Sequence, residues 1–360
     1  AFQCPGRSAG RDVDDNTATK AAVLSLFVSI ASYNDPMLPH TLDNCLANAR
    51  RPDAVRFGIC WQSDPKEPVD VERFKRDPRF RIYECLTSES EGGSWARNIA
   101  QSHWDGETYS MQVDSHMAFA PGWDASLIRM MESLPADKPL ITVNAPLFEM
   151  GPDETVCRSD MGNCVSALSS WDEDMGWSPW FVWGARVRNG TGPVRNRFLS
   201  GNFIFSLGEW TDAVRQDPEH YYWGEEFAIT LRSYTHGYDF FVPDDLVVWH
   251  LHHTAAPPRR HWEHGDQVIR AKNKTAFERL HWLAYSDDPK ATKPLGRYGL
   301  GSQRTRAEFE RFSGMKLDAK LAHPDAFEGL PPNPNTITTD ADWDDCISFE
   351  AYTKLRDSKS

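Results

Sequence analysis

The sequence contains no apolar run long enough to cross a lipid bilayer, although it is 360 residues long. The apolar stretch at residues 21–30 is too short for that and is typical of a buried strand. A recognisable secretory signal is also missing. We therefore expect a cytoplasmic protein without a membrane-spanning segment.

Cysteine is sparse, and its spacing forms no pattern. The 7 cysteines are odd in number, and none of them lies in a Cys-x-x-Cys pair. A disulfide framework would need paired cysteines at regular spacings. We therefore expect reduced thiols, as in cytoplasmic proteins.

Positive charge is in deficit. The chain has 39 Lys and Arg against 52 Asp and Glu, which gives a formal net charge of −13. This charge argues against nucleic acids and anionic membranes as partners, because both are negatively charged. A phosphate-bearing ligand would consequently need a local positive centre, supplied by arginine, lysine or a bound metal ion.

The hydrophobic pattern alternates between strands and helices over residues 22–145. Strands are expected at residues 22–30, 54–61, 80–83, 108–113 and 140–143. This alternation predicts an α/β fold in which a mostly parallel open sheet has helices on both faces. We expect residues 1–20 to form a loose arm, residues 21–316 the main domain and residues 317–360 a C-terminal extension.

Periodicity fades between residues 149 and 199, where we expect a long irregular insertion. Four tryptophans lie within it: Trp171, Trp177, Trp180 and Trp183. Beyond the insertion, the pattern predicts strands at residues 201–206 and 246–249. It also predicts helices at residues 224–236, 266–285 and 304–312.

Asp114 and His116 directly follow the expected strand at residues 108–113. Side chains alternate along an extended chain, so these two point to the same side and could hold one divalent cation. In open α/β sheets, ligands bind at the carboxyl ends of the strands. The simpler interpretation is a surface loop that carries an Asp and a His by chance, because Asp-x-His is short and common.

A second imidazole cluster follows the expected strand at residues 246–249 and consists of His250, His252 and His253. One of these histidines could complete a carboxylate–imidazole set that leaves open positions for substrate oxygens. Such a set suits Mn²⁺ better than Mg²⁺, and Zn²⁺ would also fit. The alternative is a polar loop whose imidazoles cap carbonyl groups, and we favour it for His252 and His253.

Three further groups of polar residues could bind a ligand. Glu225 and Glu226 follow an aromatic-glycine pair at an expected helix N-terminus, where carboxylates are also ordinary caps. Arg97 near another helix N-terminus could attract phosphate, although a solvent-exposed helix arginine is the simpler interpretation. The third group lies on a glycine-rich loop that would suit a diphosphate: Arg297, Tyr298 and Arg304.

Five stretches together resemble a known family: residues 27–36, 93–97, 112–117, 223–226 and 304–314. In this order they resemble the metal-dependent, retaining glycosyltransferases of the GT-A fold. Within these, the chain looks like family 60, the polypeptide α-GlcNAc-transferases that modify hydroxyproline on the SCF ubiquitin-ligase adaptor of protists. The resemblance covers residues 22–316 and is more specific for the family than for the acceptor.

The resemblance implies a site for Mn²⁺, or another divalent cation, made of Asp114, His116 and His250. The metal would bridge the diphosphate of the donor, UDP-GlcNAc, and stabilise the departing UDP. The remaining donor-binding residues that it implies are Ser32 and Tyr33 near the uridine, Ser115 between the two ligands, Arg97 near the donor, and Arg297, Tyr298 and Arg304 near the leaving diphosphate.

Glu225, Glu226 and Arg97 are the implied catalytic residues, with both glutamates near the transferred sugar. The resemblance assigns no protein nucleophile and suggests front-face attack, in which a UDP phosphate takes the acceptor proton. Asn34 is a departure, because members of the family often have arginine there.

The implied partners are a UDP-sugar and a protein acceptor, the SCF adaptor, and a homodimer is compatible with the resemblance. The insertion at residues 149–199 would be a lid or an acceptor-side surface. Two other classes stay open at this point. One is a metallohydrolase or oxygenase that uses Asp114, His116 and His250, and the other is a non-catalytic sugar-nucleotide-binding protein.

Overall fold

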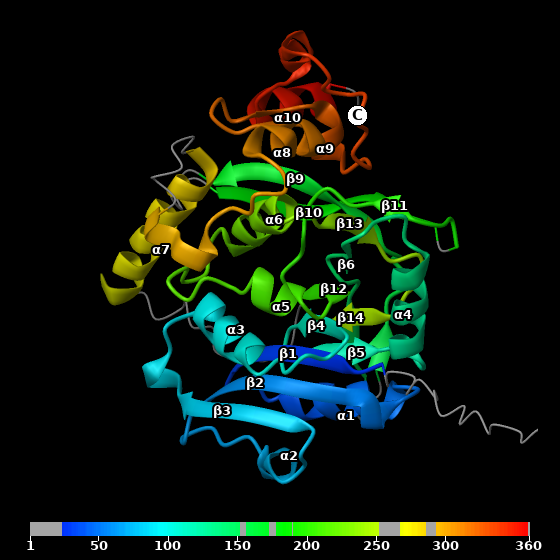
Figure 1. Cartoon of the computed structure of the whole chain (residues 1–360), viewed down its shortest axis with the longest axis vertical. Helices are drawn as coiled ribbons and strands as arrows, with labels where there is room; N and C mark the ends of the chain where they lie inside the picture. Colours follow the sequence, from blue (N-terminus) through cyan, green and yellow to red (C-terminus); the bar gives the residue numbers. More distant parts are fainter. Residues whose placement is uncertain are drawn as a thin grey trace, which may run out of the picture.

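The computed structural model describes residues 24–151, 156–172, 178–188, 190–251, 267–285 and 293–358. The strands of its central sheet are β1 (Leu26–Tyr33), β2 (Val55–Ser63), β3 (Phe80–Leu86), β4 (Tyr109–Val113), β6 (Pro139–Thr142), β11 (Val194–Arg195), β12 (Phe203–Leu207) and β13 (Asp239–Val242). They form one 8-stranded sheet in the order β11-β13-β6-β12-β4-β1-β2-β3 (Figure 1). The expected α/β class with a mostly parallel sheet is confirmed, while the expected arm at residues 1–20 lies outside the described residues.

The N-terminal half of the sheet is parallel and has helices on both faces. β1 pairs in parallel with β2 and β4, and β2 pairs in parallel with β3. Leu26, Val28 and Ile30 of β1 pack in one cluster with α1 (Leu38–Asn48) and α4 (Trp123–Ser133). α3 (Gly93–Ser102) packs on the opposite face, where a Cβ on Gly58 would lie 2.3 Å from the carbonyl oxygen of Ala100. The glycine in β2 therefore lets α3 approach the sheet closely.

The C-terminal half of the sheet departs from the parallel pattern. β12 lies between β4 and β6 and is antiparallel to both, and the edge strand β11 is antiparallel to β13. The hydrophobic pattern predicts that a strand forms at residues 201–206, but it contains no information on strand direction. A short separate ribbon is formed by β5 (Met117–Phe119) and β14 (Val248–His250), which are antiparallel.

Much of the segment expected to be irregular is in fact β structure. It contains the strand pair β7 (Phe148–Met150) and β8 (Val156–Arg158) and the longer pair β9 (Cys164–Asp172) and β10 (Ser178–Arg186), both antiparallel. β9 escaped recognition because Val165, Ser166 and Ala167 are all buried, so the strand shows no alternation of apolar and polar residues.

The remaining elements surround this framework. The longer helices are α6 (Glu225–Thr235), α7 (Gln267–Tyr285), α8 (Arg306–Ser313) and α10 (Phe349–Asp357). The shorter elements are α2 (Glu72–Lys75), α5 (Trp210–Ala213), α9 (Pro324–Glu328), β15 (Met315–Lys316), β16 (Leu321–Ala322), and the 3₁₀ turns η1 (Pro52–Ala54), η2 (Thr87–Glu89), η4 (Lys293–Tyr298) and η5 (Asp340–Asp345). Among the described residues, no helix has the length and apolar character that a membrane span needs.

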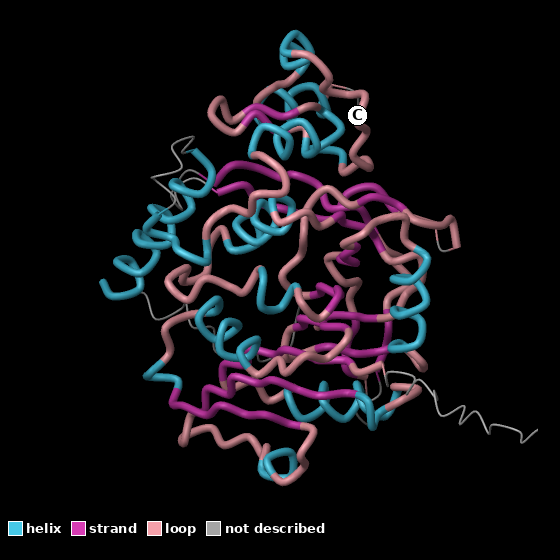
Figure 2. The backbone as a smooth tube through the Cα atoms, in the orientation of Figure 1, coloured by secondary structure: helices cyan, strands magenta, loops and turns pink. Residues whose placement is uncertain are grey.

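The C-terminal extension docks on the β9–β10 hairpin, at the top of the molecule in Figures 1 and 2. Arg197 is buried and donates hydrogen bonds to the carbonyl oxygens of Ser313 at 2.7 Å and Leu330 at 2.9 Å. The backbone of Gly329 approaches Gly184 on β10 so closely that a Cβ on Gly184 would lie 2.6 Å from the Gly329 Cα. The extension is thus packed against the main domain.

Candidate functional site

Asp114 and His116 lie where the central strand β4 ends, and the β5–β14 ribbon brings His250 to them. β14 pairs with β5 so that His250 lies opposite Met117, the residue after His116. The backbone N–H of Leu251 donates to the carbonyl oxygen of His116 at 3.0 Å and fixes this register. Three side chains that are up to 136 residues apart in sequence are thereby placed together.

The three side chains form a group that could hold a metal ion. One potential ligand atom from each of Asp114, His116 and His250 lies within 4.8 Å of the others. The two imidazole centroids are 4.6 Å apart, and Oδ2 of Asp114 lies 3.1 Å from Nε2 of His250. One carboxylate and two imidazoles are a donor set that suits Mn²⁺ or Zn²⁺. The residues present therefore fit a divalent cation.

A second carboxylate, Asp35, orients one of these imidazoles from behind. Its Oδ2 lies 2.6 Å from Nδ1 of His116 and accepts a hydrogen bond from Oγ of Ser115 at 2.6 Å. Burial opposes the charge of Asp35, but His116 and Ser115 outweigh that effect and hold the pKa of Asp35 below its ordinary value. With Nδ1 engaged by Asp35, Nε2 is the nitrogen that would coordinate a metal ion, as is common at metal sites.

Asp35 was missed from the sequence, although it directly follows the first strand of the parallel sheet. The carboxyl ends of β1 and β4 lie at the same sheet edge, so an acid after β1 could have been connected with the Asp-x-His motif.

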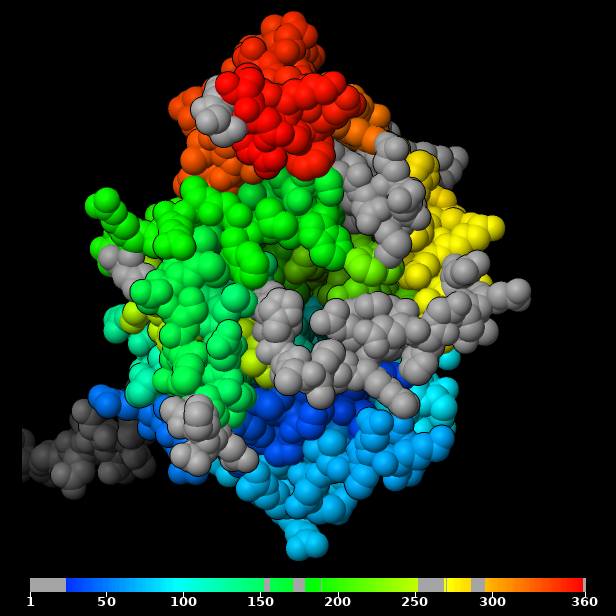
Figure 3. Space-filling model, turned by 180° about the vertical axis from the view of Figure 1, so that it is seen from behind, coloured from blue at the N-terminus to red at the C-terminus, as the bar shows by residue number. Residues whose placement is uncertain are grey.

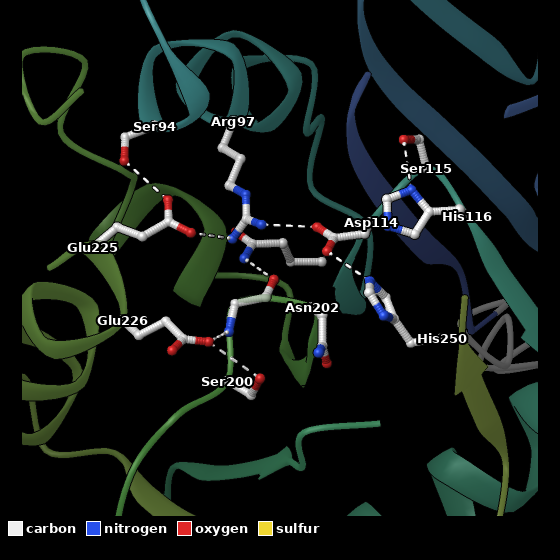
Figure 4. A network of polar contacts seen from close by, with 12 residues as sticks. Ser94, Arg97, Asp114, Ser115, His116, Ser200, Asn202, Glu225, Glu226 and His250 are labelled. Carbon is white, nitrogen blue, oxygen red and sulfur yellow. Dashed lines mark hydrogen bonds and ion pairs between the residues drawn. The ribbon is translucent and has the colours of Figure 1, made fainter. Parts of the chain in front are cut away.

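Arg97 on α3 connects the metal-competent group to the carboxylates of α6. Its Nη2 lies 2.8 Å from Oδ1 of Asp114 and its Nη1 lies 3.2 Å from Oε1 of Glu225 (Figure 4). The side chain is only 12% exposed, so the interpretation of Arg97 as a solvent-exposed helix residue is wrong. Burial alone would raise the pKa of Asp114, but Arg97 and the hydrogen bond with His250 lower it well below its ordinary value.

Glu225 and Glu226 are held in two different ways. Glu225 contacts Arg97 and accepts a hydrogen bond from Oγ of Ser94 at 3.1 Å. Glu226 accepts hydrogen bonds from the backbone N–H of Gly201 at 2.7 Å and from Oγ of Ser200 at 3.2 Å. Burial raises the pKa of Glu226 to about 7. Figure 4 shows Glu225 directed toward Arg97 and Glu226 directed toward Ser200.

The other residues expected at the donor site lie in different places. Ser115 is buried against Asp35, and Ser32 near the end of β1 is fully buried. Tyr33 is the last residue of β1 and is partly buried at the same sheet edge as Asp114. Of Ser32 and Tyr33, it is therefore Tyr33 that is accessible to solvent.

The two arginines of the glycine-rich loop pair with carboxylates outside this group of residues, Asp212 and Asp239. Arg304 donates to Oδ1 of Asp239 at 3.0 Å, and Asp239 is the first residue of β13, which runs in the same direction as β4. Arg304 therefore lies at the amino ends of the strands, whereas Asp114 lies at their carboxyl ends. Arg297 donates to Asp212 on α5, and Tyr298 accepts from Nδ2 of Asn98 at 3.2 Å. His252 and His253 lie outside the described residues.

Figure 3 shows the molecule from behind, with the C-terminal extension (red) at the top, segments coloured green in the middle and the first strands (blue) below them.

A comparison with solved structures finds similar proteins. GalNAc-T7, in a crystal structure with UDP, GalNAc and Mn²⁺, matches with a TM-score of 0.55 and 14% identity over 87% of this chain. The chain spans 60% of the length of that protein. Residues 1–349 of TarS from S. aureus in complex with UDP-GlcNAc match with a TM-score of 0.45 and 13% identity, covering 81% of this chain and 70% of that one. The likeness to GalNAc-T7 shows the GT-A fold.

A sequence comparison with curated proteins gives no match. The scan against family models matches the family described as "Glycosyltransferase (GlcNAc)" over residues 25–74 and 69–319, which together are most of the chain. The protein therefore belongs to this family of glycosyltransferases.

Proposed function

We propose that this glycosyltransferase moves GlcNAc from UDP-GlcNAc to a hydroxyl group of a protein. The observation that carries the proposal is the convergence of Asp114, His116 and His250 at the carboxyl end of β4, with Arg97 and Glu225 beside them. The carboxyl ends of sheet strands are where nucleotides bind in open α/β folds. The description of the family supports GlcNAc as the sugar.

Asp114, His116 and His250 would hold Mn²⁺. When bound, the cation supplies Lewis-acid stabilisation of the negative charge that develops on the leaving diphosphate. Asp35 keeps His116 in the tautomer and orientation that a ligand needs, since it engages Nδ1 at 2.6 Å. Arg97 keeps Asp114 ionised and in place from the other side. The protein thus preorganises the ligand set.

The contacts of the two glutamates support separate roles. Both oxygens of Glu225 are engaged, by Arg97 and Ser94, so this side chain is a fixed acceptor for sugar hydroxyls rather than a free nucleophile. Glu226 has one oxygen on Gly201 and Ser200, and its raised pKa allows it to donate or accept a hydrogen bond near neutral pH. Neither side chain is assigned as a covalent nucleophile. A phosphate oxygen of the departing UDP then takes the proton of the acceptor hydroxyl.

The acceptor that we propose is a hydroxyproline of the SCF ubiquitin-ligase adaptor in the cytoplasm. The family resemblance supports this choice. Five described cysteines are free, which supports a reducing compartment: Cys45, Cys60, Cys85, Cys164 and Cys346. The test offers UDP-GlcNAc and Mn²⁺ with hydroxylated and unhydroxylated adaptor as paired acceptors. Equal HexNAc addition to both, or to neither, measured by mass spectrometry, would exclude hydroxyproline.

The donor chemistry is tested without any acceptor. Hydrolysis of UDP-GlcNAc, UDP-Gal and UDP-GalNAc is measured side by side with Mn²⁺, and the first is expected to be fastest. Asp114→Ala should retain less than about a tenth of the activity, because it removes one of three metal ligands. Asp105→Ala is the control, since its side chain is 85% exposed.

Thermal shift separates the other two classes. A glycosyltransferase is stabilised by UDP in a metal-dependent way, because UDP binds through the cation. Stabilisation by Mn²⁺ that is indifferent to UDP would instead support a metallohydrolase. Donor binding without any turnover would support a non-catalytic sugar-nucleotide-binding protein.

A further inference from the structure

Three aromatic rings form a row beside the site: Trp180, Trp223 and Tyr222. The ring centroids of Trp180 and Trp223 are 5.4 Å apart, and those of Trp223 and Tyr222 are 5.0 Å apart. These are the separations of directly packed aromatic pairs. The row connects β10 with the segment that leads into α6.

The outer end of the row is open to solvent. The side chain of Trp180 is 43% exposed, whereas its neighbour Phe181 is buried and stacks on Phe198 with centroids 4.1 Å apart. The pairing of β10 with β9 shifts in register between Trp180 and Phe181, and such irregularities re-aim side chains, often next to active sites. The hairpin therefore directs one aromatic ring into the core and holds the other at the surface.

The inner end of the row lies in the site. Trp223 stands two residues before Glu225, whose carboxylate is 3.2 Å from Arg97. Tyr222 and Trp223 lie on the segment that enters α6 at Glu225. The row thus leads from solvent to the expected position of the donor.

The rings are held on a fixed backbone. Nε2 of His220 lies 2.6 Å from the carbonyl oxygen of Trp223. The carbonyl oxygen of Tyr221 accepts a hydrogen bond from the N–H of Gly93, the first residue of α3, at 2.9 Å. Rigid aromatic surfaces bind ligands with little loss of side-chain entropy.

We propose that Trp180 and Trp223 form an acceptor subsite that takes a pyrrolidine ring of an extended polypeptide. The inference rests on the proposed transfer to a protein hydroxyl. Extended proline-containing segments dock on aromatic-lined surfaces, because their backbone is already ordered and their rings are flat and apolar. Arg97, the cation that contacts Glu225 in the adjoining site, is engaged by two carboxylates, so a neutral segment fits better than an acidic one.

The test compares Trp180→Ala and Trp180→Phe with the control Tyr83→Ala, an aromatic residue on β3 that is equally exposed at 43%. Calorimetry with the enzyme, UDP and Mn²⁺ measures the Kd for a peptide that contains one 4-hydroxyproline. The same peptide with serine in its place is the reference ligand. Steady-state transfer then gives separate KM values for the peptide and for UDP-GlcNAc.

Trp180→Ala should weaken the binding of the hydroxyproline peptide about five- to tenfold, the loss of one ring-stacking contact. Its KM for the peptide should rise by the same factor, and more than its KM for the donor. Trp180→Phe should recover most of the loss, and Tyr83→Ala should bind like the wild type. Unchanged binding by Trp180→Ala, or equal Kd values for the hydroxyproline and serine peptides, would overturn the subsite. A wild-type enzyme that hydrolyses no UDP-sugar would defeat the proposed donor chemistry, while the calorimetry would still decide on the subsite.

Discussion

Arg97→Met is expected to destabilise the protein far more than substitution of an exposed arginine. The guanidinium lies 2.8 Å from Asp114 and 3.2 Å from Glu225, and its side chain is 12% exposed. At an effective dielectric constant of about 20, each contact supplies roughly 5–6 kcal/mol of Coulomb energy, which is opposed by several kcal/mol for removing each ion from water. Removal of the shared cation leaves two carboxylates without a counter-charge, which costs about 3–5 kcal/mol in the free energy of unfolding.

The assay is urea unfolding of the wild type, Arg97→Met and the control Arg297→Met. Arg297 pairs with Asp212, and both side chains are about half exposed, at 49% and 50%. The control should therefore lose no more than about 1 kcal/mol. Adding Glu225→Gln to Arg97→Met should restore part of the stability, because it removes one uncompensated charge. A loss below about 1 kcal/mol for Arg97→Met, or no recovery in the double variant, would refute the reasoning.

Three further variants test other parts of the site. Gly201→Ala should lower donor hydrolysis roughly tenfold, because misplaced groups lose orientation: its Cβ would lie 2.7 Å from Nη1 of Arg97 and 3.0 Å from Oε1 of Glu225. Burial raises the pKa of Glu226 from 4.5 to about 7, so unfolding releases a proton between these values and stability falls as pH rises through that window. Glu226→Gln should remove this loss and gain about 1–3 kcal/mol over the wild type between pH 5 and pH 8, measured by urea unfolding at both. Mn²⁺ should raise the Tm of the wild type, and His250→Ala should lose most of that shift, because metal binding stabilises the folded state through its affinity; an equal shift in both would contradict the ligand role.

The strongly periodic elements could be predicted from the sequence. The first strand, expected at residues 22–30, is found as Leu26–Tyr33, and the helix expected at residues 224–236 is found as Glu225–Thr235. Hydrophobic periodicity determines such elements locally. The antiparallel direction of β12 could not be predicted in this way, because direction depends on which strands become neighbours. The buried strand β9 was not predicted, because it shows no alternation of apolar and polar residues.

The features of the site can be separated in the same way into those that the sequence predicts and those that depend on tertiary packing. Asp114 and His116 were recognisable because residues two apart in an extended segment share a side, and His250 because it follows a strand. The contacts of these residues could not be predicted, since Asp35 reaches His116 and Arg97 reaches Asp114 only through tertiary packing. The glycine-rich loop illustrates the converse, because composition could not reveal that Arg304 would pair with Asp239 at the far edge of the sheet.

The anchoring of the C-terminal extension by Arg197 affects the cooperativity of unfolding. A chain cut after residue 316 would lose the Leu330 carbonyl that accepts from Arg197 and would uncover the surface of β10 on which Gly329 lies. A buried guanidinium deprived of such an acceptor is costly, and the hairpin that carries Trp180 would lose its outer support. We therefore expect residues 317–358 to unfold together with the main domain, so that native-state proteolysis cleaves between them only when the whole unit opens.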